Sequence, residues 1–333
     1  MSTTTADLRA PHGRRGGVLA AIATVLLLMV GACGGGGTSD QPAPTTTAAA
    51  SADVFPQTLT SPYGQTTLPA APQRVVALGV AERDTVLALG IVPVAAGGYG
   101  DLDPWFTAKA AGVENLELSD GIPFEKIAAV RPDLIITGWG QEADYTQLSA
   151  IAPVLWQVSA TFATDWRAQA TTIAITLGKS ADGARLVAET DAKVKAAAAA
   201  NPSFAGKTFT WSTYDSGTAS TVDLPTAPVV GFLGDLGLRL KPELANPASA
   251  YARDVSTELL ETIDADVVIV YPGSPAAKAE LEGMRTWQRL RGVEAGGAVF
   301  LDDAQANGLN SPTLLSIPFV LDQVTPMLAK ATA

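Results

Sequence analysis

The sequence predicts an α/β protein of two similar lobes, each with a parallel-type sheet flanked by helices. One long helix joins the lobes, and a ligand cleft lies between them. The first indication is that apolar runs of strand length alternate with helical patterns along most of the chain. The second is an internal repeat, because residues 125–136 (EKIAAVRPDLII) are echoed without a gap by residues 258–269 (ELLETIDADVVI). The third is a long helical segment, residues 180–200, between the two copies.

Each copy of the repeat begins with a glutamate, Glu125 or Glu258, that opens a short amphipathic helix. An aspartate eight positions later, Asp133 or Asp266, leads into an apolar strand. Two more pairs of segments recur in the same order: Tyr145, Leu148 and Ile151 with Trp287, Leu290 and Val293, and residues 87–90 (LALG) with 234–237 (GDLG). Three echoes in one order indicate two related lobes.

The joining segment, residues 179–201, is predicted to be helical because it is rich in alanine and free of Gly and Pro after its first turn. Ser180, with Asp182 two positions on, is a candidate cap, and Asn201-Pro202 ends the helix. Apolar and small residues recur three or four positions apart and define the face that packs: Val187, Thr190, Val194 and Ala197.

The first 32 residues have the pattern of a secretory signal peptide. A basic region with Arg14-Arg15 precedes an apolar run over residues 18–30, which is short for a membrane span. Small residues then precede Cys33, the single cysteine of the chain, in an arrangement that resembles the bacterial lipobox. We therefore expect Cys33 to carry a diacylglycerol anchor and the protein to be held, outside the cytoplasm, on the cell membrane.

Residues 33–55 are of low complexity and predict a flexible tether between the anchor and the folded body. Without residues 1–32 the chain has 19 basic and 32 acidic residues, a net charge of −13. This acidic balance argues against nucleic acid or anionic lipid as a partner.

The first lobe is predicted over residues 56–178 and the second over residues 202–333. Expected strands of the first lobe are residues 72–79, 92–96, 134–137 and 154–157, and its expected helices are residues 82–89, 124–130 and 144–151. Expected strands of the second lobe are residues 208–211, 267–270 and 298–301. Its expected helices are residues 228–236, 257–263 and a closing helix over 317–330 that is kinked at Pro326.

Ligands of open parallel sheets bind at the carboxyl ends of the strands, so the residues there are candidate contacts. They are Tyr99 and Trp139 in the first lobe, and Trp211, Tyr214 and Tyr271 in the second. Aromatic side chains offer broad, half-polar contact surfaces, although each can equally pack its own lobe. Arg83 and Arg253 are candidate partners for an anionic group, with a surface arginine as the alternative.

Enzyme chemistry has little support in the sequence. His12 is the single histidine and belongs to the predicted signal peptide, so neither a Ser-His-Asp arrangement nor a His-based metal site is available. No glycine-rich phosphate loop and no G-x-S-x-G elbow occurs. We predict no catalytic residue, no metal site and no resident cofactor.

From Pro72 to its C-terminus the chain resembles solute-binding proteins of the ferric-siderophore and cobalamin group of ABC importers, the class with a rigid helical hinge. The resemblance rests on residues 72–78 (PQRVVAL), 87–94 (LALGIVPV), 125–136 and 287–293 (WQRLRGV). It implies that Glu125 and Glu258 dock against arginines of a permease, and that Trp139 and Tyr99 contact the ligand. Residues 119–124 (SDGIPF) hold no counterpart of the cleft arginine that ferrichrome binders carry just before the first docking glutamate.

The resemblance thus predicts a monomeric, lipid-anchored binding protein that delivers a ferric siderophore to an ABC permease and its ATPase, with Fe³⁺ carried by the ligand. One alternative is a haem or corrinoid binder, in which Tyr214 or Tyr271 serves as an axial ligand. Another is a lipoprotein that senses or scaffolds without transport.

Overall fold

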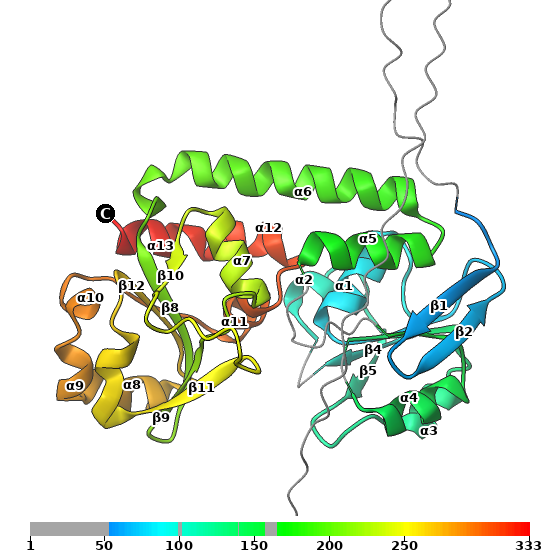
Figure 1. Cartoon of the computed structure of the whole chain (residues 1–333), viewed down its shortest axis with the longest axis horizontal. Coiled ribbons are helices and arrows are strands. Elements are labelled where there is room, and N and C mark those ends of the chain that lie inside the picture. Colours follow the sequence, from blue (N-terminus) through cyan, green and yellow to red (C-terminus); the bar gives the residue numbers. More distant parts are fainter. Residues whose placement is uncertain (1–52, 99–101, 139, 157–164) are drawn as a thin grey trace, which may run out of the picture. The chain divides into compact units, whose positions relative to one another are not determined.

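The computed structural model describes residues 53–98, 102–138, 140–156 and 165–333. The first lobe comprises β1 (Gln57–Ser61), β2 (Gly64–Leu68), β3 (Val75–Leu78), α1 (Val80–Ala88), β4 (Ala95–Gly98), α2 (Pro104–Thr107), β5 (Glu114–Glu117), α3 (Phe124–Ala129), β6 (Leu134–Thr137), α4 (Glu142–Ser149) and β7 (Val154–Trp156) (Figure 1). Two helices follow, α5 (Trp166–Thr176) and α6 (Ser180–Ala200).

The second lobe begins with the 3₁₀ helix η1 (Pro202–Phe204) and contains most of the remaining helices. Its strands are β8 (Thr208–Asp215), β9 (Thr218–Val222), β10 (Arg239–Leu240), β11 (Ala252–Ser256), β12 (Val267–Tyr271) and β13 (Ala298–Phe300). Its other helices are α7 (Pro228–Asp235), the 3₁₀ helix η2 (Thr257–Ile263), α8 (Pro275–Gly283), α9 (Arg285–Gln288), α10 (Arg291–Glu294), α11 (Asp303–Asn310), α12 (Ser316–Gln323) and α13 (Thr325–Ala331).

The sheet of the first lobe is parallel throughout, in the order β5-β4-β3-β6-β7. This confirms the predicted fold class. The prediction for the second strand was wrong by three residues, because β4 runs over 95–98 and leaves Val92 exposed. Pro93 explains the shift, since proline has no N–H to donate to a neighbouring strand.

The sheet of the second lobe is mixed rather than purely parallel. Its order is β11-β9-β8-β12-β13; β8, β12 and β13 are parallel, whereas β9 and β11 run antiparallel to their neighbours. The β8–β9 hairpin turns at Ser216 and Gly217, which both have positive φ, 46° and 84°. Ser-Gly is a signal for such a two-residue turn, and the sequence interpretation missed it.

The aspartates of the two repeat copies make equivalent contacts in the two lobes, each with the start of a neighbouring strand. Asp133 accepts the backbone N–H groups of Gln73 and Arg74 at 2.8 Å each, just before β3. Asp266 accepts the backbone N–H and the hydroxyl of Thr208 at 2.7 Å, at the start of β8. In each lobe the aspartate precedes one strand, β6 or β12, and binds the start of the neighbouring strand, β3 or β8.

The other two echoes also occupy equivalent places. Gly90 and Gly237 end α1 and α7 with φ of 81° and 104°, a conformation that favours glycine. The third echo, Tyr145, Leu148 and Ile151 in the first lobe, packs on the sheet face that α3 and α4 cover. Its counterpart in the second lobe packs on the face that α8 and α9 cover, and in each set two of the three residues are buried. The predicted relation between the lobes is thus present in their packing.

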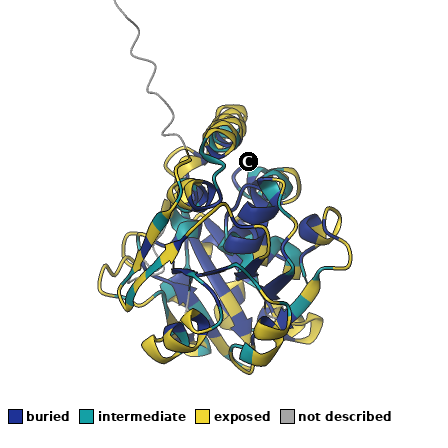
Figure 2. Ribbon diagram, turned by 90° about the vertical axis from the view of Figure 1, so that its right-hand side faces the viewer, coloured by how far each residue is buried: buried dark blue, intermediate teal, exposed yellow. Residues whose placement is uncertain are grey.

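Alternate residues of each strand enter the cores on the two faces of the sheet. In the first lobe Val75, Ala77 and Ile136 face α1 and α5, whereas Val76 and Ile135 face α3 and α4. The central strands are mostly buried, whereas β1, β2, β5 and β11 are largely exposed or half-buried, as are the outer helices (Figure 2). Each sheet is therefore the middle layer of its lobe.

The helix α6 has the predicted bounds, and Thr190 and Val194 are buried on the predicted face. Ser180 does not cap it with its own side chain; instead Ser180 donates its backbone N–H to Asp53 at 3.1 Å. The carboxylate of Asp53 takes the role of the cap because it is a better acceptor than a hydroxyl at a helix N-terminus.

The joint between the lobes contains a second helix, α5, that the sequence interpretation did not predict. Trp166 and Ala170 of α5 pack in the main core of the second lobe, and Ile173 and Leu177 pack in the core of the first. Gly183 lets α6 approach α5, since a Cβ there would lie 2.3 Å from that of Ala174. The predicted joining helix α6 is thus accompanied by α5, which packs against it and against the cores of both lobes.

One helix prediction in the second lobe needs correction. The segment predicted as a helix over residues 257–263 is a 3₁₀ helix with non-helical angles at Leu259. The closing helix is present as predicted over residues 316–331; it is interrupted at Val324, where α12 ends and α13 begins, and Pro326 lies in the first turn of α13.

We expect Asp133→Ala to lower the free energy of unfolding by about 1 to 2 kcal/mol, because two backbone N–H groups lose a charged acceptor. Chemical denaturation checks this. Asp266→Ala is the matched variant in the second lobe and should have a similar effect. An unchanged denaturation midpoint for both variants would contradict a role of the repeat in strand placement.

Candidate functional site

Two predicted ligand contacts, Tyr99 and Trp139, lie outside the residues that the structure describes. The described ends of their flanking segments are Gly98 at the end of β4 and Gly140 before α4. Gly140 has a φ of 123°, and a Cβ there would lie 2.7 Å from the ring of Trp156. Trp156 itself is buried and packs edge to face with Tyr63 at 5.4 Å between ring centroids.

In the second lobe, Trp211 and Tyr271 come from neighbouring strands and face the same side of the sheet. The indole Nε1 of Trp211 donates to Asn310 Oδ1 at 3.0 Å, and the Tyr251 hydroxyl donates to the same oxygen at 2.5 Å. Tyr271 is half-buried and bonds to Asp303; burial, and then this carboxylate, raise its pKa. We call Trp211, Tyr251, Tyr271 and Asn310 the second-lobe aromatic face.

The sequence interpretation missed Tyr251 and Asn310 of this face. Tyr251 directly precedes β11, and Asn310 ends α11. Neither element was predicted, so no strand end pointed to them. Trp211 is 3% exposed and lies beneath this face, so the half-buried rings of Tyr251 and Tyr271 are the ones that offer surface to a broad, half-polar ligand.

Tyr214 lies on the opposite face of β8 from Trp211, because its position differs by an odd number of residues. It is buried in the core under α8, and its hydroxyl donates to Glu280 at 3.0 Å. Burial, and then Glu280, raise its pKa to about 12. This places Tyr214 in the core of its own lobe, away from the aromatic face.

Arg253 is available to an anionic group. It lies on β11, an edge strand, with 41% of its side chain exposed. Its Nε is 3.9 Å from Asp223 Oδ2, so the pair is loose, and the buried Asp223 Oδ1 has no hydrogen-bond partner. The backbone N–H of Asp223 donates to the carbonyl of Tyr251 at 3.2 Å, which links this pair to the aromatic face.

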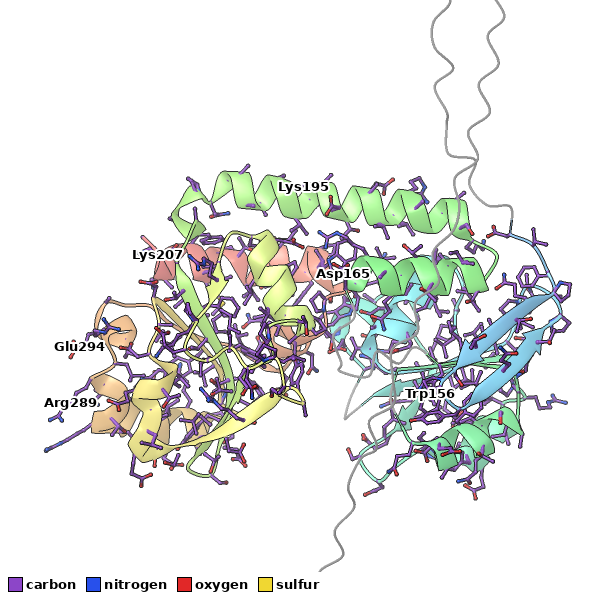
Figure 3. All side chains as sticks on the ribbon, viewed as in Figure 1. Trp156, Asp165, Lys195, Lys207, Arg289 and Glu294 are labelled. Carbon is purple, nitrogen blue, oxygen red and sulfur yellow. The ribbon has the colours of Figure 1, made fainter. Side chains whose placement is uncertain are left out.

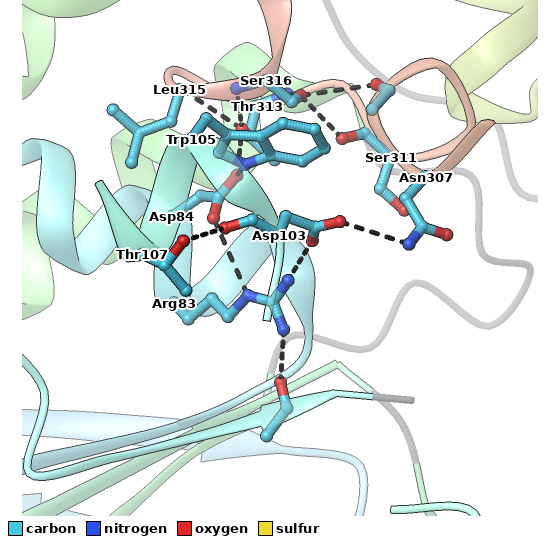
Figure 4. A network of polar contacts seen from close by, with 12 residues as sticks. Arg83, Asp84, Asp103, Trp105, Thr107, Asn307, Ser311, Thr313, Leu315 and Ser316 are labelled. Atoms are coloured by element: carbon cyan, nitrogen blue, oxygen red, sulfur yellow. Dashed lines mark hydrogen bonds and ion pairs between the residues drawn. The ribbon is translucent and has the colours of Figure 1, made fainter. Parts of the chain in front are cut away.

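Arg83, in contrast, is buried and occupied within the protein (Figure 4). Its guanidinium pairs with Asp103, donates to the carbonyl of Gly97 at 3.2 Å and lies 5.4 Å from the ring centroid of Phe106. Asp84 Oδ1 is 3.8 Å from Arg83 Nε. The structure therefore gives Arg83 a place in a buried ion network, with no surface for a ligand.

Three carboxylates share this one arginine. Burial raises the pKa of Glu82 to about 7 and that of Asp84 to about 7, and it also raises the pKa of Asp103. Burial is the largest cause for each, while hydrogen bonds and Arg83 act in the opposite direction. If all three carboxyl groups were ionised, a single arginine would face three negative charges, so burial favours the protonated form of these groups.

The two candidate docking glutamates are exposed in the first turns of equivalent segments. Glu125 lies in α3, and Glu258 lies in η2. Hydrogen bonds from its own backbone N–H and from Ser256 lower the pKa of Glu258. Both side chains are therefore accessible to a partner.

A pocket of about 600 Å³ lies at the amino ends of β8 and β12, the wrong end for a strand-end ligand site. Lys207, labelled in Figure 3, borders it together with Lys241 and Arg291. Lys241 donates to two backbone carbonyls, and Arg291 pairs with Asp264 at 3.0 Å. Two of its three basic side chains are thus occupied by the protein itself.

Among the residues described, no three His, Cys, Asp or Glu side chains are arranged to hold a metal ion. No helix in the described ranges is long and apolar enough to cross a membrane.

Comparisons with known proteins agree on one family. A protein-family model described as "Periplasmic binding protein" matches residues 75–305. The probable siderophore-binding lipoprotein YfiY of Bacillus subtilis (strain 168) is 30% identical over 253 residues, which cover 71% of this chain and 77% of that protein.

Two solved structures share the fold with a TM-score of 0.71 each. A periplasmic solute binding protein from Mycobacterium smegmatis is 30% identical, with 83% of this chain and 98% of that chain covered. PiaA from Streptococcus pneumoniae TIGR4, solved in complex with ferrichrome, is 27% identical, with the same shares covered.

The buried carboxylates predict a pH dependence of stability. A carboxyl whose pKa is raised in the folded state stabilises fully below its unfolded pKa, and this contribution is lost as pH rises through the folded pKa. For Glu82 and Asp84 the loss falls between about pH 4 and pH 7. The free energy of unfolding should therefore fall between these pH values. We expect Glu82→Gln and Asp84→Asn each to make this fall smaller by about 1 to 3 kcal/mol.

Chemical denaturation at pH 5 and pH 8 measures the effect. Glu142→Gln, at an exposed position in the first turn of α4, is the control and should keep the decline of the original protein. If all three variants decline equally, the buried carboxylates do not titrate as described.

Proposed function

The chain belongs to the periplasmic binding protein family, and we propose that it is the substrate-binding component of an ABC importer that captures a ferric siderophore. The observation that carries the proposal is the match to YfiY, which is named as a siderophore-binding lipoprotein, over most of both chains. The second-lobe aromatic face and the loosely paired Arg253 support it, because iron chelators present conjugated rings and anionic oxygens. The protein binds and releases its ligand, and no bond is made or broken.

Fe³⁺ is cargo in this proposal and stays within the chelator. The ligand site of the second lobe then comprises Tyr251, Tyr271 and Arg253, with the buried Trp211 beneath them, and Tyr99 and Trp139 complete it from the first lobe. Arg83 and Tyr214 are left out, because their polar groups are buried and bonded within the protein.

A haem or corrinoid is the alternative ligand, and Tyr214 argues against its simplest form. An axial tyrosinate must lose its proton and reach the metal, whereas Tyr214 is buried, donates to Glu280 and has a pKa raised to about 12. Tyr271 also has a raised pKa and a carboxylate partner.

The proposed location is the outer side of the cell membrane, with Cys33 as the site of the lipid anchor. The low-complexity segment before Asp53 then gives the body its reach from the membrane, since Asp53 and Phe55 already contact the folded body. The proposed partners are an ABC permease and its ATPase, which Glu125 and Glu258 approach from the two lobes. Their exposure and equivalent placement support a two-point contact with arginines of a pseudo-symmetric permease.

A ligand panel tests the proposed function. We expect one or more ferric siderophores of a panel that includes ferrichrome and ferrioxamine B to quench tryptophan fluorescence of the purified protein saturably, because tryptophans lie near the proposed site. Haem and cobalamin serve as competitors from the alternative class. Saturable binding of haem or cobalamin alone would transfer the protein to that class, and no response to any ligand would favour a sensor or scaffold.

Two tryptophan variants separate binding from stability in the same assay. Trp139→Ala should weaken siderophore binding by about 1 to 3 kcal/mol. Trp156→Ala should instead lower stability, because Trp156 is a buried ring of the first-lobe core (Figure 3). Equal losses of affinity in both variants, after correction for unfolding, would remove the support for Trp139.

The docking proposal predicts an effect only in the complex. Glu125→Ala and Glu258→Ala should leave siderophore affinity unchanged, and each should reduce stimulation of the transporter ATPase, with the largest loss in the double variant. Glu142→Ala, another exposed first-turn glutamate, controls for the helix dipole, which is worth about 0.3 to 1 kcal/mol. Full stimulation by the double variant would rule out the docking role.

A further inference from the structure

The buried carboxylate of Asp84 connects the two lobes. Asp84 Oδ2 accepts the Trp105 indole N–H at 2.8 Å from within the first lobe (Figure 4). The same oxygen accepts the Thr313 hydroxyl of the second lobe at 2.7 Å, across 229 positions of the chain. Asp84 has no exposed surface, and Thr313 is also buried.

Further contacts surround this bond. Asn307 of α11 donates to Asp103 Oδ1 at 3.2 Å, and the same aspartate pairs with Arg83. The rings of Trp105 and Phe319 pack with their centroids 4.9 Å apart. Asp103 and Trp105 lie in the segment that follows β4. Through these contacts the segment is bonded to both lobes.

We propose that Asp84 and Thr313 form a latch between the lobes, which fixes their relative rotation and so positions the ligand contacts of both lobes at one separation. They are positioning residues, because they act on the ligand through the lobes and do not touch it. The latch itself is independent of the ligand's identity, whereas its effect on ligand exchange rests on the proposed function.

The bonding of Thr313 explains why the latch has one preferred geometry. Its hydroxyl oxygen accepts the backbone N–H of Ser316 at 2.8 Å and that of Leu315 at 3.2 Å. Its oxygen is thus fully used as an acceptor, and the hydroxyl proton is directed to Asp84. Rotation of the lobes would leave the fully buried carboxylate of Asp84 with one donor fewer, which is costly at a position removed from solvent.

Distance measurement between the lobes tests the latch directly. Spin labels at Ala143→Cys in α4 and Ala279→Cys in α8, both exposed, report on the two lobes in a Cys33→Ser background without other thiols. We expect Thr313→Val to shift or broaden the distance distribution of the unloaded protein. Thr313→Ser, which keeps the hydroxyl, should restore it.

Thr210→Val is the matched control. Its hydroxyl is equally buried and donates to the carbonyl of Ile263 at 2.8 Å, within the second lobe alone. We expect Thr210→Val to lower stability and leave the distance distribution unchanged. A distribution for Thr313→Val as narrow as that of the original protein would overturn the latch.

Ligand exchange gives the functional readout, with ferrichrome as the probe. We expect ferrichrome to dissociate about tenfold faster from Thr313→Val, which corresponds to about 1.4 kcal/mol, and at the original rate from Thr210→Val and Thr313→Ser. Equal rates in all variants would overturn the positioning role. If ferrichrome and the other siderophores fail to bind the original protein, the proposed function falls, and the distance measurement still decides on the latch.

Discussion

The buried carboxylate of Asp84 is the constraint on which the arrangement of the two lobes depends. Removing a carboxylate from water is costly, and the cost is offset here by donors from both lobes, the indole of Trp105 and the hydroxyl of Thr313. Neither lobe alone supplies both donors. Arg83, the next residue along α1, pairs with Asp103 and so extends the same network toward Asn307 of the second lobe. The first turns of α1 are therefore part of the contact between lobes.

The helix pair α5 and α6 restrains the lobes by a different means. The two ends of α5 are buried in the cores of different lobes, so a bend within this helix would disturb both. Arg167 near the start of α5 adds a second ion cluster: its Nη2 is 2.5 Å from Asp191 of α6 and 2.8 Å from Asp235 of α7. This cluster is partly exposed and so contributes less per contact than the buried network. Together these features favour small rotations of whole lobes over hinge bending.

The position of each candidate residue along its strand decides which face of the sheet its side chain lies on, and so whether it lies near the proposed ligand site or in the core under α8. Trp211 and Tyr271 fall on the side of the sheet that α11 and the residues around Tyr251 cover, whereas Tyr214 falls on the side of α8. The docking glutamates lie in equivalent segments of the two lobes, each followed by an aspartate that holds the start of a strand. In each lobe one short repeat thus contains both the exposed glutamate and the aspartate that anchors it to the sheet. Glu125 and Glu258 therefore occupy matching places in the two lobes.

Local patterns in the sequence determined the helix at residues 180–200, the strand at residues 134–137 and the repeat with its two aspartates, because spacing, caps and apolar runs act over a few residues. They placed Trp211, Tyr214 and Tyr271 near strand ends, whereas the register of β12 on β8 put Trp211 and Tyr271 on one face and Tyr214 on the other. The tertiary structure alone decided that Arg83 is buried, that α5 joins α6 between the lobes, and that Tyr251 and Asn310 complete the aromatic face. The contact of Asp84 with Thr313 leaves no trace in the sequence around either residue, since it arises when the two lobes pack and remove both side chains from water.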